Sequence, residues 1–255
     1  MKTSLLEQLR LPGAIRIEFQ PIMTVSLKSD RTGPTQLYAY EALARGPKGT
    51  SMERPDVLFE YARRKSVEAE IDLICIGEAL SAAETLPGQP SISINLHGST
   101  MTNVDHFAET FLALAGSHGI TPNRLMLEIV EHRAPWSMDI LRNTLDELRN
   151  AGIRIALDDL GVAASNYRMI VDCRPDHLKI DRYIVHGCSA DPYRLAVLRS
   201  IVTLAQSCAA IPIAEGVEEQ RDLEAILDLG IDKVQGWLYG PSMPASAINL
   251  ERTAS

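Results

Sequence analysis

The sequence predicts a modified (β/α)₈ barrel, the TIM-barrel fold, in which one strand runs antiparallel to the others. The length of 255 residues matches the roughly 250 residues typical of one such barrel. Apolar runs alternate with helix-like segments along most of the chain, which is typical of strands joined by crossover helices. Polar residues also follow one strand after another, at the end of the barrel where catalytic residues collect. We expect a single domain over residues 1–255, because no low-complexity linker divides the chain.

The expected strands are short and continuously apolar, as strands are when both faces of a sheet are covered. They lie at 15–23, 38–45, 91–96, 125–130, 153–159, 177–180, 211–216 and 233–239. The turn-rich stretch 29–36 (SDRTGPTQ), rather than a helix, joins the first two strands. This connection predicts a hairpin, so the first strand is the one expected to run antiparallel.

The expected helices alternate with these strands and end at helix-breaking residues. Apolar residues at helical spacing predict two helices between Pro55 and Pro87. They also predict a helix that ends at Gly119 and another that ends at Gly152. Further helices are expected at 166–173, 193–208 and 218–230.

Bulk composition excludes several classes of partner. The net charge of −8 argues against a duplex DNA or RNA footprint, which needs a basic face. No apolar run approaches the roughly 20 residues of a membrane span, and the N-terminal residues do not have the pattern of a secretory signal. The four cysteines are scattered, so we expect buried thiols in the reducing cytoplasm.

Six oxygen-donor side chains at strand ends predict a site for hard metal ions. They are Glu41, Asn95, Glu128, Asp158, Asp159 and Glu215. Carboxylate and amide oxygens suit Mg²⁺ or Mn²⁺ rather than a thiolate-bound zinc ion. Two divalent ions together with Lys179 would supply five positive charges against the five carboxylates, so charge balance favours two ions. The predicted chemistry is metal-dependent hydrolysis of a phosphodiester, in which Lys179 orients water or stabilises developing charge and Glu215 accepts a proton.

Simpler interpretations exist for each residue alone. An acidic residue after one strand is more often a helix cap than a ligand, and only the recurrence of such residues along the chain favours a site. A metal-dependent barrel enzyme that forms an enolate, with Lys179 as base, is an alternative, although it leaves more carboxylates than one metal needs. His97 follows its strand closely and is expected at the surface or behind a site, while Met126, Trp237 and Tyr239 are expected to pack.

Taken in order, these stretches resemble the EAL domain family of cyclic di-GMP phosphodiesterases. The tripeptide that gives the family its name stands at 41–43, and FQPI occupies 19–22. The motifs SINL, LEIVE, LDDLG, KID, AEGVE and QG follow in the family's order, so the resemblance covers about residues 15–245. The EAL string alone is a weak signal, whereas this ordered set is specific.

The resemblance implies opening of cyclic di-GMP to linear pGpG, with two Mg²⁺ or Mn²⁺ ions per site and inhibition by Ca²⁺. The implied metal ligands are the six strand-end residues named above, and Lys179 and Glu215 are the implied catalytic residues. Implied substrate contacts are Gln20, Leu43, Arg45, Asp181 and Gln235, and Glu131 is implied to anchor the loop after the Asp pair. A homodimer, and possible regulation by a protein partner, are also implied.

One segment departs from the family pattern. Where the family has a sequence close to FGTGYSS, residues 160–166 read LGVAASN. The Ala at 163 in place of glycine disfavours positive φ, and Val162 cannot make a threonine's hydrogen bond. A receptor or scaffold that binds cyclic di-GMP and hydrolyses it weakly or not at all is therefore the alternative function.

Overall fold

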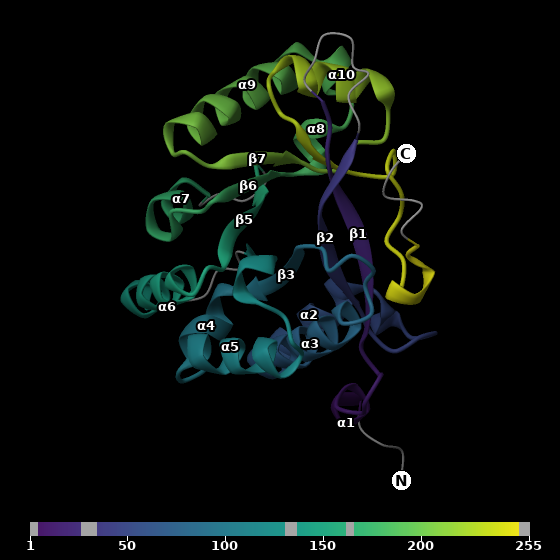
Figure 1. Cartoon of the computed structure of the whole chain (residues 1–255), viewed down its shortest axis with the longest axis vertical. Coiled ribbons are helices and arrows are strands. Elements are labelled where there is room, and N and C mark those ends of the chain that lie inside the picture. The colour runs from purple at the N-terminus through teal and green to yellow at the C-terminus, as the bar shows by residue number, and fades with distance from the viewer. Residues whose placement is uncertain (1–4, 27–34, 131–136, 162–165, 250–255) are drawn as a thin grey trace.

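Eight strands close into a barrel in sequence order in the structure, a computed structural model that describes residues 5–26, 35–130, 137–161 and 166–249 (Figure 1). The strands are β1 (Arg16–Thr24), β2 (Gln36–Arg45), β3 (Ile92–His97), β4 (Leu125–Val130), β5 (Arg154–Leu160), β6 (His177–Ile180), β7 (Ile211–Ala214) and β8 (Lys233–Gln235). All eight overlap the segments predicted from the sequence, so the barrel prediction is confirmed.

Strand β1 is the antiparallel strand, as the hairpin-like connection predicts. It pairs antiparallel with β2 on one side and with β8 on the other, while every other neighbouring pair is parallel. The carboxyl ends of β2 to β8 therefore meet at one end of the barrel. The polar residues in the carboxyl-terminal parts of these strands, and just after them, are brought together for this reason.

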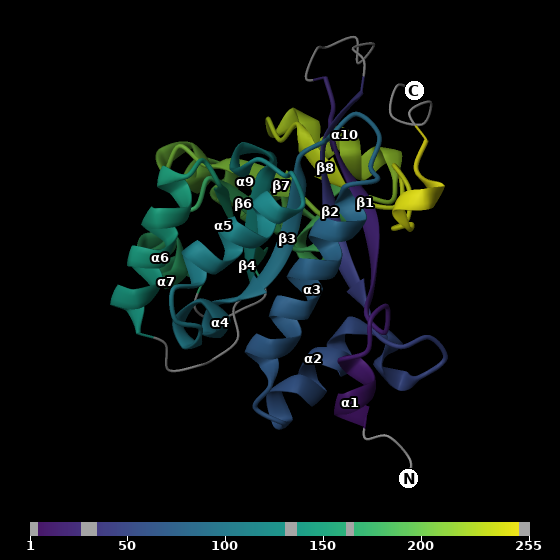
Figure 2. The same ribbon diagram turned by 60° about the horizontal axis from the view of Figure 1, so that its bottom comes forward.

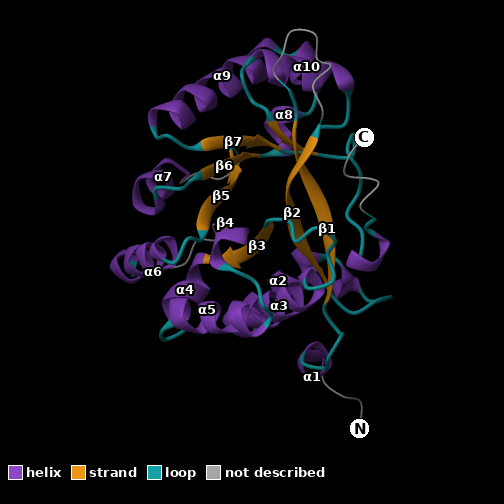
Figure 3. Cartoon of the chain, viewed as in Figure 1, coloured by secondary structure: helices purple, strands orange, loops and turns teal. Residues whose placement is uncertain are grey.

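Helices surround the strands, as the purple and orange ribbons of Figure 3 show. The longer ones are α2 (Pro55–Arg64), α3 (Glu68–Ala83), α5 (Phe107–Ser117), α6 (Met138–Asn150), α7 (Asn166–Cys173), α9 (Pro192–Ser207) and α10 (Gln220–Asp228). These seven confirm the predicted helices, including the pair expected between Pro55 and Pro87. In the turned view of Figure 2, α2 and α3 lie beside the lower part of the β1–β2 hairpin.

The outer side of β1 is covered by chain rather than by a crossover helix. The segment after β8 returns along β1, and Phe19 and Met243 exchange backbone hydrogen bonds of 2.7 and 3.0 Å. This cover is the yellow segment beside β1 in Figure 1. It follows from the hairpin, which supplies no crossover helix between β1 and β2, so that α3 and the segment after β8 both pack against β1.

Two apolar layers hold the barrel. A large core lies between strands and helices, and a small one inside the barrel consists of Ile22, Ala39, Met126, Ala156 and Ile213. All five of the inner side chains are fully buried. Deleting methylenes from such a core typically costs about 2–5 kcal/mol for a Met→Ala or Ile→Ala change.

Short elements were not predicted, and two strands end earlier than expected, the one at 211–216 already at Ala214. Helices α1 (Leu5–Leu9), α4 (Gly98–Asn103) and α8 (Arg182–Val185) are too short to show a helical period. The strand expected at 233–239 ends at Gln235, because Gly236 turns the chain. Within the described ranges, every helix is too short or too polar to cross a membrane.

Candidate functional site

A buried lysine surrounded by carboxylates lies at the carboxyl end of the barrel. Lys179 on β6 is 1% exposed, and its Nζ lies 2.5 Å from Glu128 Oε2 and 2.6 Å from Glu215 Oε1. Glu41 Oε2 and Asp158 Oδ1 lie 3.2 and 3.4 Å from the same nitrogen. Four of the predicted carboxylates, from four different strand ends, therefore converge on one ammonium group.

Glu41 links this cluster to the rest of the predicted site. Its Oε1 accepts a hydrogen bond of 2.8 Å from Asn95 Nδ2, and its Oε2 accepts one of 2.7 Å from Gln235 Nε2. The same Gln235 nitrogen donates to Gln20 Oε1 at 3.1 Å. Strand pairing explains these contacts, because Gln20 is opposite Glu41 in the β1–β2 register.

The Asp pair sits on a local irregularity of β5. The β5–β6 register shifts between Leu157 and Leu160, and Asp159 has a φ of +54°. Asp is one of the few residue types that adopts this left-handed conformation at modest cost. The bulge lets two successive carboxylates reach one place: an oxygen of Asp158, one of Asp159 and one of Glu215 lie within 4.8 Å of one another.

Crowding of the carboxylates raises several pKa values. Burial, reinforced by the charge of Glu41, raises the pKa of Glu128 to about 8. Burial and the charges of Asp158 and Asp181 raise the pKa of Asp159 to about 6. The pKa of Glu215 is raised well above its usual range, first by burial and then by its neighbours Asp158, Glu41 and Glu128, against the opposing charge of Lys179.

Glu41 and Lys179 are shifted toward their charged forms. Burial raises the pKa of Glu41, but the Lys179 charge and the hydrogen bonds from Gln235 and Asn95 outweigh it, so the pKa is lowered. Burial likewise opposes the charge of Lys179, yet the surrounding carboxylates raise its pKa well above its ordinary value. Lys179 is therefore an ammonium ion at neutral pH.

The donor set fits hard divalent cations. Two buried oxygens lack a hydrogen bond within the described part of the chain: Glu128 Oε1, and Asp158 Oδ1, which has the 3.4 Å ion pair with Lys179. Buried acceptors of this kind are normally satisfied, and here each belongs to a carboxylate of the cluster. Together with the Asp158–Asp159–Glu215 group, they offer the all-oxygen environment that Mg²⁺ and Mn²⁺ prefer.

Two predicted residues, Arg45 and Asp181, stand apart from this cluster. Arg45 donates to Glu18 Oε2 at 3.0 Å and to Ser242 Oγ at 2.9 Å, so its guanidinium is held against the segment that covers β1. Asp181 caps α8 by accepting a 2.6 Å hydrogen bond from the Tyr183 backbone, and its charge also acts on Asp159. Glu131 lies outside the described residues.

Two cavities open beside the cluster and share Glu41 and Asp158 in their linings. The first, of about 410 Å³, is mostly apolar and also includes Leu43, Asn95 and Asp159. The second, of about 300 Å³, is more polar and is lined by Gln20, Glu41, Asp158, Lys179, Arg182, Glu215, Gly216, Glu218, Gln235, Gly236 and Trp237. A ligand that reached the carboxylates could therefore extend to either side of them.

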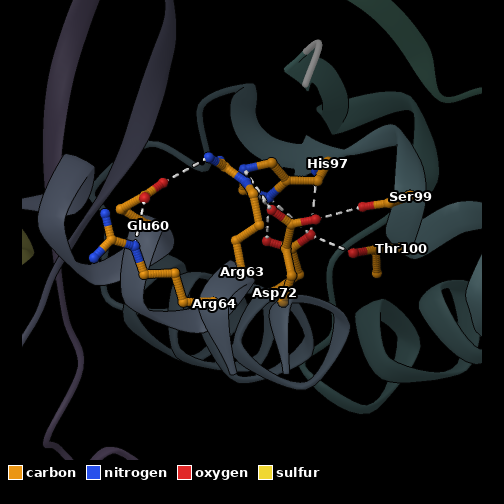
Figure 4. A network of polar contacts seen from close by, with 8 residues as sticks. Glu60, Arg63, Arg64, Asp72, His97, Ser99 and Thr100 are labelled. Carbon is orange, nitrogen blue, oxygen red and sulfur yellow. Dashed lines mark hydrogen bonds and ion pairs between the residues drawn. The ribbon is translucent and has the colours of Figure 1, made fainter. Parts of the chain in front are cut away.

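A buried polar network supports the wall of the first cavity (Figure 4). Asp72 is 1% exposed and accepts hydrogen bonds from the His97 backbone, from His97 Nδ1 and from Thr100 Oγ1. The His97 ring, which lines the cavity, packs on Phe59 with centroids 4.8 Å apart. The network holds the junction of β3 and α4, two residues beyond Asn95, which agrees with the expected place of His97 behind the site.

Two expectations about packing and burial were wrong. Met126 is fully buried as expected, but Trp237 is 69% exposed, at the rim of the second cavity. Cys75, Cys173 and Cys188 are buried thiols, whereas Cys208 is exposed. Arg182 and Trp237 were not predicted to line the site, because neither follows a strand end directly and no periodic signal marks a cavity rim.

A profile for the EAL domain matches residues 4–242. The chain belongs to the EAL domain family. This match extends the resemblance by about eleven residues at its amino end and ends three residues earlier than expected.

Named relatives agree with this assignment. The chain is 28% identical over 207 residues to the probable cyclic di-GMP phosphodiesterase PdeA of Escherichia coli, covering 80% of this chain and 28% of PdeA. It is 29% identical over 193 residues to the cyclic di-GMP phosphodiesterase PdeF of the same organism, covering 74% of this chain and 26% of PdeF. The chain therefore spans less than a third of the length of these relatives.

Solved structures of the family share the fold. The EAL enzyme Bd1971, in a form with cAMP and cyclic di-GMP bound, superposes with a TM-score of 0.81 at 25% identity, over 94% of this chain and 65% of Bd1971. Klebsiella pneumoniae BlrP1, in a complex with manganese and cyclic di-GMP, has a TM-score of 0.77 at 25% identity, over 91% of this chain and 57% of BlrP1.

Proposed function

We propose that this chain hydrolyses cyclic di-GMP to linear pGpG by a mechanism that uses two divalent cations. The observation that carries the proposal is the convergence of Glu41, Glu128, Asp158 and Glu215 on Lys179, with Asp159 adjoining, in a member of the EAL family. The two cavities that flank this cluster suit a dinucleotide, because its scissile phosphodiester can lie at the carboxylates while its halves extend to both sides.

The six oxygen donors named above are proposed to hold Mg²⁺ or Mn²⁺. When bound, a pair of such ions supplies Lewis-acid activation of the phosphodiester and of water. Burial first, and then the repulsion of neighbouring carboxylates, raises the pKa values of Glu128 and Asp159, and the same concentration of negative charge favours the binding of cations. Ca²⁺, a larger ion with looser geometry, is expected to occupy the site without supporting turnover.

Lys179 and Glu215 are proposed as the catalytic pair. Lys179 remains protonated, so it can orient water and stabilise negative charge on the phosphoryl oxygens. The same raised pKa argues against the enolate-forming alternative, because a base must lose that proton. Glu215 Oε1 lies 2.6 Å from Lys179 Nζ, so its carboxylate is placed to accept the proton of a water that Lys179 orients.

Substrate contacts are proposed for Gln20, Leu43, Arg45, Asp181 and Gln235. Gln20 and Gln235 line the second cavity and Leu43 lines the first. Arg45 would have to leave Glu18 or Ser242 to meet a phosphate, and Asp181 would act through solvent around Asp159. Anchoring of the 160–166 loop by Glu131 remains part of the proposal.

Hydrolysis is tested with purified protein, cyclic di-GMP and either Mg²⁺ or Mn²⁺, with pGpG followed by chromatography. We expect product with both ions and loss of at least about 100-fold in rate for Glu41→Ala and Glu215→Gln. Glu109→Gln, at an exposed position of α5, is the matched control and should keep wild-type activity. Absence of pGpG from folded wild-type protein with either ion would overturn the proposal.

A cyclic di-GMP receptor with little or no turnover is the second candidate. The sequence LGVAASN at 160–166 favours it, since this segment follows Asp158 and Asp159 directly. Tight binding of the nucleotide in Ca²⁺ together with no pGpG in Mg²⁺ or Mn²⁺ would establish this function instead.

The remaining partners are proposals as well. A homodimer and a regulatory protein partner are inferred from the resemblance, and duplex nucleic acid is not an expected ligand of so acidic a chain. The four free cysteines agree with a reducing compartment, so we propose a cytoplasmic location.

A further inference from the structure

An exposed tryptophan lies at the rim of the cavity that contains Lys179 and Glu215. Trp237 has 69% of its surface exposed, although large aromatic side chains usually bury most of theirs. It lines the same cavity as Gln235, the side chain that donates to Glu41. Only Gly236 separates these two residues in the chain, so Trp237 is held close to the carboxylate cluster.

The surroundings of Trp237 place a guanidinium beside the indole. The Arg182 guanidinium carbon is 5.9 Å from the centroid of a Trp237 ring, within the range of a cation–π contact. Glu218 Oε1 accepts from Arg182 Nη2 at 2.8 Å and fixes the direction of the guanidinium. We name Trp237 and Arg182 together the rim ledge.

Two glycines make the ledge possible. A Cβ at Gly216, whose φ is +64°, would collide with the side chain of Arg182. A Cβ at Gly236 would collide with the backbone of Val217. Only glycine fits at either position without a collision. The two glycines therefore let Arg182 and Trp237 approach this edge of the cavity.

We propose that the rim ledge is a stacking surface for one purine base of the substrate. This inference rests on the proposed function and assigns to Trp237 a substrate-binding role at the same site. A base that stacks on the exposed indole would cover apolar surface, and its phosphodiester would remain within the cavity next to Lys179. Stacking of bases on aromatic and guanidinium planes is a general mode of nucleotide recognition.

Charge explains why the ledge suits a base better than a phosphate. The positive charge of Arg182 is already paired with Glu218, and Glu41, Asp158 and Glu215 make the rest of the cavity acidic. A phosphate at the ledge would meet little net positive potential. The flat, uncharged face of a purine does not require a positive potential, because dispersion and burial of apolar surface stabilise its stacking.

Fluorescence gives a test that does not depend on turnover. Trp136→Phe leaves Trp237 as the sole tryptophan, since the sequence has two. Titrating this protein with cyclic di-GMP in Ca²⁺ should quench the emission at saturation. Dissociation constants should rise about 10-fold or more for Trp237→Ala and at most about threefold for Trp237→Phe, which keeps an aromatic face.

Kinetics separate stacking from a structural role. A contact made equally in the ground and transition states changes KM and leaves kcat intact, so Trp237→Ala should raise KM about 10-fold at unchanged kcat. Tyr193→Ala removes a ring that is 84% exposed on α9 and lines neither cavity, so it is the matched control.

Unchanged emission on saturation, with affinity and KM of Trp237→Ala within twofold of wild type, would overturn the ledge and leave the proposed function standing. A fall in kcat with unchanged KM would also overturn it, because that result indicates damage to the catalytic cluster. Wild-type protein that neither binds nor hydrolyses cyclic di-GMP would overturn the proposed function and the ledge with it.

Discussion

At the scale of single residues, the central feature is one ammonium ion that neutralises part of a buried acidic cluster. Lys179 makes contacts of 2.5 to 3.4 Å with four carboxylates. Removing one partner from a buried ion pair is costly, because the remaining charges stay buried without compensation. Lys179 therefore has a structural effect in addition to its proposed role in catalysis.

Replacing Lys179 with methionine should destabilise the protein in a cation-dependent way. With chelator present, we expect the free energy of unfolding to fall by about 3–5 kcal/mol, as for other broken buried ion pairs. Addition of Mn²⁺ should restore more stability to Lys179→Met than it adds to wild type, because cations replace the lost charge. Urea unfolding with and without Mn²⁺ measures both effects.

Lys65→Met is the control for this experiment, since Lys65 is exposed at the end of α2. It should behave as wild type with and without Mn²⁺. Equal Mn²⁺ stabilisation of Lys179→Met and wild type would contradict the interpretation that the ammonium and the cations serve the same carboxylates.

The residue types at the site could be predicted from the sequence, but the contacts of long side chains could not. Glu41 and Asn95 lie on strands and Glu215 follows one, so the topology alone brings them together. Arg45 and Trp237 depend instead on how the segment after β8 packs, which no local pattern encodes. Asp181 caps α8, which is the ordinary role of an acidic residue just after a strand, and its charge also raises the pKa of Asp159.

At the scale of elements, the site depends on how tightly the chain turns just beyond each strand. Strand β8 has only three residues, and the turn after it packs against the connection between β7 and α10. Val217 N donates to Gln235 O at 3.0 Å, and Leu238 N donates to Val217 O at 3.1 Å. The position of Gln235 in the cluster is therefore tied to this packing.

Gly236→Ala should loosen this part of the site. The added Cβ would collide with Val217 backbone, and overpacking of this kind typically costs about 1–3 kcal/mol. We expect a lower melting temperature and a fall in the rate of hydrolysis, because Gln235 would no longer be held against Glu41. Thermal unfolding and the pGpG assay measure these effects.

Gly116→Ala is the opposite case and the control. Gly116 lies in α5 with nothing within 4 Å of an added Cβ, so alanine should stabilise the helix by about 0.5–1 kcal/mol at unchanged activity. If Gly236→Ala had the same small effect, close packing at the end of β8 would not be a requirement of the site.

At the scale of the whole molecule, the barrel has a second buried polar group, His177 with Tyr38, at the end opposite the carboxylate cluster around Lys179. His177 begins β6, two residues before Lys179, and is 1% exposed. Its Nε2 lies 2.6 Å from the Tyr38 hydroxyl at the start of β2. Burial, with the charge of Arg154, lowers the pKa of His177 to about 4.

The lowered pKa predicts an acid-dependent loss of stability. Above pH 6.5, His177 is neutral in both folded and unfolded chains, so its contribution is fully present. As the pH falls from 6.5 toward 4, only the unfolded chain binds the proton, and stability falls by up to about 3 kcal/mol. Urea unfolding at pH 7, 5.5 and 4.5 should show a flatter pH dependence for His177→Gln than for wild type. Parallel curves would contradict this assignment, whatever the absolute stability of the variant.

Helix α7 carries exposed apolar side chains that suit self-association. Helix α7 follows the segment after Asp158 and Asp159, and it exposes Tyr167 and Val171 by 74% and 71%. These residues are four apart, so they lie on one face of the helix. Two large apolar side chains on a solvent-facing stripe suit an isologous contact with a second copy, which is the proposed homodimer.

Val171→Asp should weaken dimerisation at least about 10-fold, because a charge in an apolar interface must be desolvated on association. The free energy of unfolding of the monomer should change by less than about 0.5 kcal/mol, since Val171 is exposed there. Sedimentation velocity over a range of concentrations measures the first effect and urea unfolding of dilute protein the second. Leu11→Asp, at a 57% exposed position beyond α1, is the control and should dimerise as wild type does. Dimerisation that is lost in Leu11→Asp but retained in Val171→Asp would place the interface away from α7.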